Sequence, residues 1–146
     1  MRSLGITRLD HVAMAVWRVE EYLPLLTELL GMKVVGRWRS EEEKYAGATL
    51  DLPGGDVQWE VVEPISDDSF LTRFLKQRGP GLHHVTFQVE DVEKAAEVLR
   101  RRGIEPFGGV RAGSTWKEIF IHPRDSGGLL IQLFEGYWPD SSANTD

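Results

Sequence analysis

The chain has no cysteine, no excess of basic residues and no long hydrophobic run. Without cysteine there is no disulfide, zinc–thiolate site or thiol nucleophile, so any metal must be held by histidine, carboxylate or carboxamide groups. The 17 basic and 23 acidic residues give a net charge of -6, a poor match for nucleic acid or anionic membranes. No apolar run approaches the ~20 residues of a membrane span, and the start MRSLGITRLD lacks the apolar core of a secretion signal. We therefore expect a soluble, cytoplasmic protein.

The sequence repeats itself once. The string L-D-H-V-A-M-A-V (residues 9–16) aligns with L-H-H-V-T-F-Q-V (residues 82–89), which lies 73 residues later. Each copy is followed by an amphipathic stretch that ends in a glycine, Gly31 or Gly103, and then by short β-type runs. W-E-V-V-E and I-Q-L-F-E match near the ends of the two halves at a spacing of 72. The pattern predicts a βαβββ module present twice.

We expect one α+β domain over residues 1–146, since neither module alone could bury much apolar surface. Two modules related by a pseudo-twofold axis should form one curved mixed sheet with helices outside. The expected parts are module one (6–64), a linker helix (66–78), module two (80–136) and a frayed tail (139–146). The expected helices are 19–30 and 92–102, and the expected strands after them are 33–38, 45–52, 57–63, 105–110, 115–122 and 129–135.

Strand alternation selects one polar face in each module. In the first copy the bulky residues suit packing against a helix, which leaves His11 on the opposite face among alanines. The same parity in the second copy assigns His84, and not His83, to the face that the two modules share. Glu60 and Gln132 are interior positions of the last strand of each module, 49 and 48 residues after these histidines. Each module thus offers one imidazole and one carboxylate or carboxamide.

These four side chains predict a metal site made of His11, Glu60, His84 and Gln132. Nitrogen and oxygen donors without sulfur suit Mn, Fe, Co, Ni or Zn, and open coordination positions would accept substrate oxygens. Taken singly, each residue is better explained as a satisfied polar group in a strand. Their occurrence together at equivalent positions of the repeat favours the metal.

The chain resembles the vicinal oxygen chelate superfamily and, within it, the methylmalonyl-CoA epimerases. The resemblance runs over residues 9–135 and is carried by L-D-H-V-A-M-A-V, G-L-H-H-V-T-F-Q-V-E-D-V, I-F-I-H-P-R and G-G-L-L-I-Q-L-F-E. It implies the paired βαβββ fold, one divalent metal ion, an acyl thioester substrate and a homodimer. Other members of the superfamily are glyoxalase I, extradiol dioxygenases, fosfomycin-modifying enzymes and metal-free drug-binding proteins.

The sequence departs from the epimerase pattern at three positions. The resemblance implies Gln where this chain has Glu60, Glu where it has Gln132, and a further glutamate where it has Ala48. Anchored on the proline that closes each strand, the counterpart of Ala48 in module two is Glu118. We interpret these differences as the epimerase site rotated by the pseudo-twofold axis.

In the rotated site, Glu60 on the metal and Glu118 off it would remove and return an α-proton beside a metal-polarised carbonyl. The alternative for Glu118 is an exposed charge in a strand. Three other functions stay open: a glyoxalase I-type lyase, an Fe(II) extradiol-type dioxygenase using His11, His84 and Glu60, and a metal-free small-molecule-binding resistance protein. Gln132 argues against the dioxygenase, because that class has Glu there.

Other features are interpreted as structural. His83 and His122 have the wrong parity or lie at a strand end. The glycine-rich segment 108–114 opens a strand rather than a helix, so it lacks the setting of a phosphate-binding loop.

Overall fold

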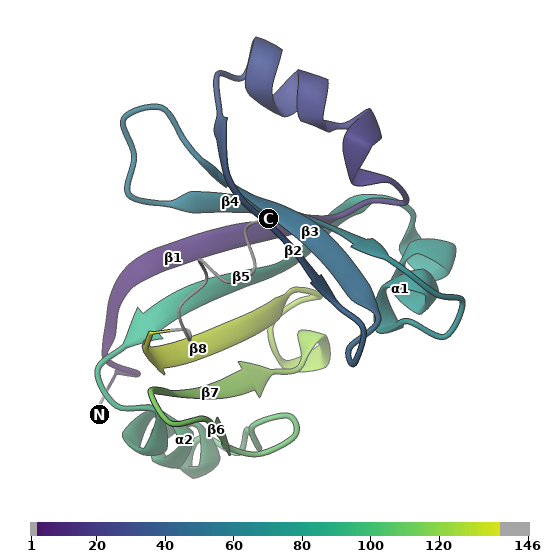
Figure 1. Ribbon diagram of the computed structural model, residues 1–146. Coiled ribbons are helices and arrows are strands. Elements are labelled where there is room, and N and C mark those ends of the chain that lie inside the picture. The colour runs from purple at the N-terminus through teal and green to yellow at the C-terminus, as the bar shows by residue number, and fades with distance from the viewer. Residues whose placement is uncertain (1–2, 138–146) are drawn as a thin grey trace. The chain divides into compact units, whose positions relative to one another are not determined.

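The computed structural model describes residues 3–137, and its strands form one mixed eight-stranded sheet in the order β2-β3-β4-β1-β5-β8-β7-β6 (Figure 1). β5 and β8 run parallel, whereas the β2–β3, β3–β4, β6–β7 and β7–β8 pairs are antiparallel. The expected α+β fold class is confirmed. The strands are β1 (Ile6–Ala15), β2 (Lys33–Ser40), β3 (Tyr45–Asp51), β4 (Gln58–Pro64), β5 (Gly81–Val89), β6 (Arg111–Ala112), β7 (Trp116–Ile121) and β8 (Leu130–Gly136).

Two regular helices begin at capping side chains. Ser69 caps α1 (Phe70–Arg78) by accepting a hydrogen bond from the Leu71 backbone N–H, and Asp91 caps α2 (Val92–Arg101) by accepting from that of Lys94. Both caps satisfy a backbone donor that the helix itself leaves without a partner. The remaining helical segments are short: the 3₁₀ turn η1 (Val19–Glu21), the π-helix η2 (Leu25–Leu29) and the 3₁₀ turn η3 (Pro123–Asp125).

The chain divides into two compact units, and each is described by itself. Unit 1 combines the segment up to His11 with the segment from His84 onward, and unit 2 comprises Val12–His83. Strands β1 and β5 therefore each contribute residues to both units. The sequence-based boundaries of 6–64, 66–78 and 80–136 remain a prediction, and the expected tail of 139–146 lies outside the described residues.

The core of unit 1 lies between α2 and the sheet. Val92, Ala96 and Leu99 of α2 are at most 5% exposed and form one apolar cluster with Ile119 of β7 and Leu133 of β8. Their helical spacing of three and four residues places them on one face of α2. Burial of this face against the strands fixes which side of β7 and β8 remains for polar residues.

Unit 2 has two apolar clusters. One joins Val16, Val19 and Leu26 to Ala48 of β3 and Val61 of β4. The other packs two leucines of α1 against the sheet, and its buried members are Ala15, Val62, Leu71 and Leu75.

Two expected elements differ from the structure. No strand forms over 105–110, where Gly108 and Gly109 have positive φ angles of 81° and 71° that break an extended run. The expected helix over 19–30 is replaced by η1 and η2, and the backbone N–H of Leu30 bonds to the carbonyl of Leu25, five residues back. The other expected strands and the second helix are observed with ends shifted by one or two residues.

Candidate functional site

Two predicted histidine ligands lie together in unit 1. The ring centroids of His11, on β1, and His84, on β5, are 5.5 Å apart, and the ring planes make an angle of 80°. His11 is 4% exposed, and His84 is half-buried. The structure therefore brings together the two imidazoles that strand alternation selected.

Asp10 sets the tautomer of His11. The Nδ1 atom of His11 lies 2.8 Å from Asp10 Oδ1. Burial alone raises the pKa of Asp10, but hydrogen bonds from His11, Gln88 and Arg8 outweigh it and lower the pKa to about 2. Asp10 is therefore a carboxylate that only accepts, so His11 donates through Nδ1–H and its other ring nitrogen, Nε2, lies toward Thr86. A metal-binding histidine uses this arrangement.

A chain of buried polar groups continues from His11. Thr86 Oγ1 lies 3.1 Å from His11 Nε2 and donates to Gln132 Oε1 at 2.6 Å. Gln132 Nε2 donates to Glu118 Oε1 at 2.7 Å, and Glu118 Oε2 lies 3.3 Å from Arg111 Nη1. The side chains of Thr86, Gln132 and Glu118 are buried, while Arg111 is exposed. The predicted ligand Gln132 thus contacts the predicted base Glu118, and an exposed strand position is wrong for Glu118.

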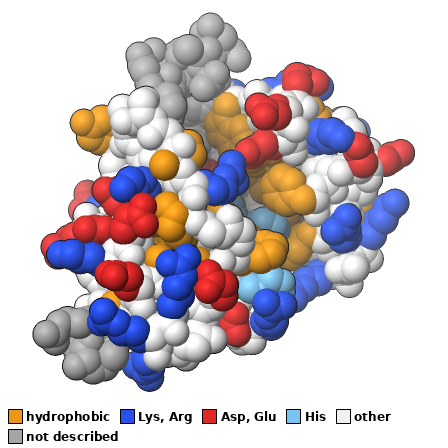
Figure 2. All heavy atoms as spheres, turned by 90° about the horizontal axis from the view of Figure 1, so that it is seen from below, with side chains coloured by type: hydrophobic (Ala, Val, Ile, Leu, Met, Phe, Trp, Pro, Cys, Tyr) orange, Lys and Arg blue, Asp and Glu red, His pale blue; other side chains and the backbone are white. Residues whose placement is uncertain are grey.

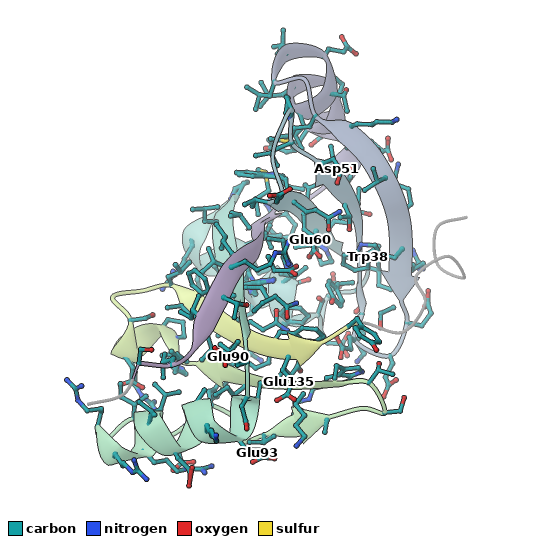
Figure 3. All side chains as sticks on the ribbon, turned by 90° about the vertical axis from the view of Figure 1, so that its left-hand side faces the viewer. Trp38, Asp51, Glu60, Glu90, Glu93 and Glu135 are labelled. Atoms are coloured by element: carbon teal, nitrogen blue, oxygen red, sulfur yellow. The ribbon has the colours of Figure 1, made fainter. Side chains whose placement is uncertain are left out.

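Glu60 lies in unit 2, half-buried on β4 and opposite Thr49 of β3 in the sheet register. The indole Nε1–H of Trp38 donates to Thr49 Oγ1 at 3.3 Å. The same indole covers Gly47, because a Cβ atom at that glycine would lie 2.7 Å from the Trp38 ring and 2.7 Å from the Val61 carbonyl oxygen. Figure 3 labels Glu60 and Trp38. The strands beside Glu60 therefore have no room for a side chain at position 47.

In the sheet register the counterpart of Glu118 is Gly47, and not Ala48 as the alignment on the two prolines gave. Glu118 and Gly47 each pair with the residue two places after the predicted ligand of their own module. Ala48 instead belongs to the apolar cluster on the other side of its strand. The alignment is off by one because Pro53 follows Gly47 by six residues, whereas Pro123 follows Glu118 by five.

The two remaining histidines make structural contacts. The ring of His83 lies 4.9 Å from that of Phe74, and burial together with the nearby Arg78 charge lowers the pKa of His83 to about 4. His122 caps η3 and makes an edge contact with Phe107 at 4.9 Å between ring centroids. These contacts agree with their interpretation as structural residues.

Sequence reasoning assigned no role to Asp10, Thr86 or Arg111. Thr86 shares the parity of His84, and that shared face was the available signal. Arg111 lies in the glycine-rich segment, where sequence alone does not reveal that β6 pairs it with Glu118. Asp10 directly precedes His11, and strand alternation assigns neighbouring residues to opposite faces. Alternation therefore did not predict the contact between the Asp10 carboxylate and the His11 ring.

Among the described residues, no helix has the length and apolar character needed to cross a membrane. On the face drawn in Figure 2, described acidic and basic side chains are interspersed, and histidine side chains are visible beside hydrophobic ones.

The family model of the Glyoxalase/Bleomycin resistance protein/Dioxygenase superfamily matches residues 10–120, so the chain belongs to this superfamily. The mitochondrial methylmalonyl-CoA epimerase of Mus musculus is 32% identical over 129 residues, which are 86% of this chain and 71% of that protein. The crystal structure of methylmalonyl-CoA epimerase from Mycobacterium tuberculosis has a TM-score of 0.81 and 31% identity, and covers 98% of this chain and 97% of its own.

A third similar protein is a variant of the Streptomyces coelicolor methylmalonyl-CoA epimerase in complex with 2-nitronate-propionyl-CoA. Its TM-score is 0.79 with 27% identity, and the match covers 92% of this chain and 100% of that chain. The resemblance stated from the sequence is confirmed, and the likeness supports an epimerase-like function.

Proposed function

We propose that this protein is a divalent-metal-dependent epimerase that moves the α-proton of a methylmalonyl-CoA-like acyl thioester. The observation that carries the proposal is the pair of imidazoles in unit 1, His11 and His84, which have ring nitrogens within 4.8 Å of one another. Its support from related proteins is the likeness to methylmalonyl-CoA epimerases.

The proposed ligand set fits a divalent ion chemically. His11 would offer Nε2 to the ion, because its Nδ1–H is held by Asp10. His84 adds a second imidazole, Glu60 a carboxylate, and Gln132 a carboxamide oxygen. This sulfur-free set suits Co, Mn, Ni, Zn or Fe and leaves coordination positions for substrate oxygens.

The reaction requires one group to take a proton and another to return it. When bound, the divalent ion would polarise the thioester carbonyl and make the α-proton more acidic. One carboxylate, Glu60 or Glu118, would take that proton as the C–H bond breaks and its electron pair moves toward the carbonyl oxygen, giving the enolate. The other, in its protonated form, would return a proton to the α-carbon from the opposite face. Each turnover leaves the substrate with inverted configuration and no net change in composition.

The test is proton NMR of methylmalonyl-CoA in deuterated water, with and without a chelator. We expect exchange of the α-proton that the chelator abolishes. Glu118→Gln and Glu60→Gln should each slow exchange by about 10²- to 10⁴-fold, the usual contribution of a positioned acid or base. Glu97→Gln is the matched control, since this exposed glutamate lies on α2.

Two outcomes would contradict the proposal. Exchange that is absent from the metal-loaded protein would overturn the epimerase activity. Wild-type exchange in Glu118→Gln, with unchanged metal content, would overturn the rotated arrangement of the two carboxylates.

The same proposal includes a homodimer in the cytoplasm. The homodimer is implied by the family resemblance, and a cytoplasmic location suits a CoA thioester substrate. Sedimentation equilibrium would support the first point by giving twice the chain mass of 16.5 kDa. Fluorescence microscopy of a tagged chain in its host would test the second.

A further inference from the structure

The carboxamide of Gln132 has a defined orientation, because each of its ends meets a partner of fixed chemistry. Gln132 Nε2 lies 2.7 Å from Glu118 Oε1, and the other oxygen of Glu118 is ion-paired with Arg111. A carboxylate can only accept hydrogen bonds, so the NH₂ end of the amide must face Glu118. The carboxamide oxygen is then turned toward Thr86.

Thr86 holds that oxygen from the other side. Its side chain is fully buried, at 0% exposure, and its hydroxyl has a single hydrogen to donate. Thr86 Oγ1 donates that hydrogen to Gln132 Oε1 at 2.6 Å and lies 3.1 Å from His11 Nε2. The hydroxyl is therefore within hydrogen-bond distance of two atoms that the proposed metal site would use.

The equivalent positions around Glu60 have no such groups. The counterpart of Thr86, two residues after the histidine of the repeat, is Ala13, and the register counterpart of Glu118 is Gly47. This difference follows the chemistry of the two ligands. A carboxylate such as Glu60 offers two equivalent oxygens, whereas the carboxamide of Gln132 offers one oxygen and one NH₂ that cannot bind a metal cation.

We propose that Thr86 and Glu118 are positioning residues that orient the Gln132 carboxamide so that its oxygen becomes a metal-binding atom. This inference rests on the proposed metal site. It adds to that site the requirement that the Gln132 carboxamide be hydrogen-bonded at both its oxygen and its NH₂ group. It also gives Glu118 a role in metal binding that is separate from proton transfer.

The test is titration of the metal-free protein with Co²⁺ alone, followed by calorimetry and the visible absorption of the bound ion. Loss of a residue that orients a ligand typically weakens metal binding about 10- to 100-fold. We expect that loss in Thr86→Val, which keeps the shape but removes the hydroxyl, and recovery in Thr86→Ser. Circular dichroism of each metal-free variant verifies that the protein is folded.

The second arm concerns the other end of the amide. Glu118→Leu removes the acceptor for the NH₂ group, frees the amide to rotate and should weaken Co²⁺ binding to a similar extent. Glu118→Gln should retain most of the affinity, because its own carboxamide oxygen still accepts. In the double variant Glu118→Gln with Gln132→Glu, the hydrogen bond runs in the opposite direction and the net charge is unchanged. We expect this variant to bind Co²⁺ at least as tightly as wild type.

These outcomes separate the inference from the proposed function. Wild-type affinity in both Thr86→Val and Glu118→Leu would overturn the inference, while metal-dependent epimerisation by the wild type would still stand. A wild-type protein that binds no Co²⁺ would overturn the metal site and the inference together. Tight Co²⁺ binding by the double variant without α-proton exchange supports both, because Glu118 is then absent as a base.

Discussion

Matching positions in the two halves of the repeat contain different chemistry. In unit 1, the strands beside Gln132 present Thr86, Glu118 and Arg111, which form a buried polar chain with an exposed end. In unit 2, the strands beside Glu60 present Ala13 and Gly47 at the counterparts of Thr86 and Glu118, and Trp38 at that of Arg111.

The difference shows that one backbone plan can support two kinds of polar group. A buried carboxamide needs partners at both ends, since an unsatisfied buried donor or acceptor costs about 1 to 3 kcal/mol. At the positions around the carboxylate Glu60, the chain instead has the small residues Ala13 and Gly47, and the indole of Trp38 packs over Gly47. The geometry of the repeat is retained, and the environment of each polar residue is specific to its half.

The largest effect is expected from copying the glutamate of unit 1 into unit 2. Gly47→Glu should lower the free energy of unfolding by about 3 to 5 kcal/mol, because its Cβ would collide with Trp38 and the Val61 carbonyl and its charge would be partly buried. Urea denaturation measures the loss. Adding Trp38→Ala should recover only part of it, since the carbonyl remains. A wild-type midpoint for Gly47→Glu would show that the two strand pairs are interchangeable.

The residue that precedes the second site histidine should make the stability of the protein depend on pH in mild acid. His83, the repeat counterpart of Asp10, has a pKa of about 4 against a usual 6.5. Below pH 6.5 the unfolded chain therefore binds more protons, so stability falls as the pH drops from 6.5 to 4, by up to about 3 kcal/mol. His83→Phe should remove this part of the pH dependence. Denaturation at several pH values with a chelator present measures it, and an unchanged slope in the variant would contradict the assignment.

Equivalent hydrogen bonds from a backbone N–H to a glutamate occur in both units, and each should contribute a similar amount to the free energy of unfolding. The backbone N–H of Val19 donates to Glu63 at 2.6 Å, and that of Val92 donates to Glu135 at 2.7 Å. Replacing either glutamate by alanine should cost about 1.5 to 3 kcal/mol, the usual range for a bond to a charged group. Glutamine variants, which still accept, are the controls. A loss confined to one unit would mean that the equivalent bonds are not energetically equivalent.

The smallest effect concerns the start of each helical segment. Asp91 caps α2, whereas its counterpart Arg18 makes no side-chain cap to η1. Asp91→Ala should cost about 1 kcal/mol and Arg18→Ala less than about 0.5 kcal/mol. Thermal denaturation of both variants tests this. Equal losses would show that the cap does not distinguish the two segments.

Much of the fold was predictable because its signals are local and repeated. Alternation in 9–16 and 82–89 assigned the faces that carry His11 and His84, and the amphipathic stretch that ends at Gly103 predicted the helix α2. The strand expected over 105–110 was wrong because the pattern of side chains does not report the positive φ angles of Gly108 and Gly109.

The polar chain was less accessible to sequence reasoning because it depends on pairing between distant strands. Thr86, Gln132 and Glu118 are separated by up to 46 residues, and the registers of β5 and β7 with β8 determine which residues face one another. A one-residue shift exchanges the two faces of a strand. That is why the alignment on Pro53 and Pro123 selected Ala48 in place of Gly47.

The π-helix η2 records a difference in length between the two copies. From the site histidine to the glycine that ends the helical segment there are 20 residues in the first copy, His11 to Gly31, and 19 in the second, His84 to Gly103. A π turn is the form in which a helix absorbs one inserted residue while the chain on either side keeps its course. If the halves arose by duplication, η2 marks an insertion in one copy, and both copies kept their histidine and their glycine around it.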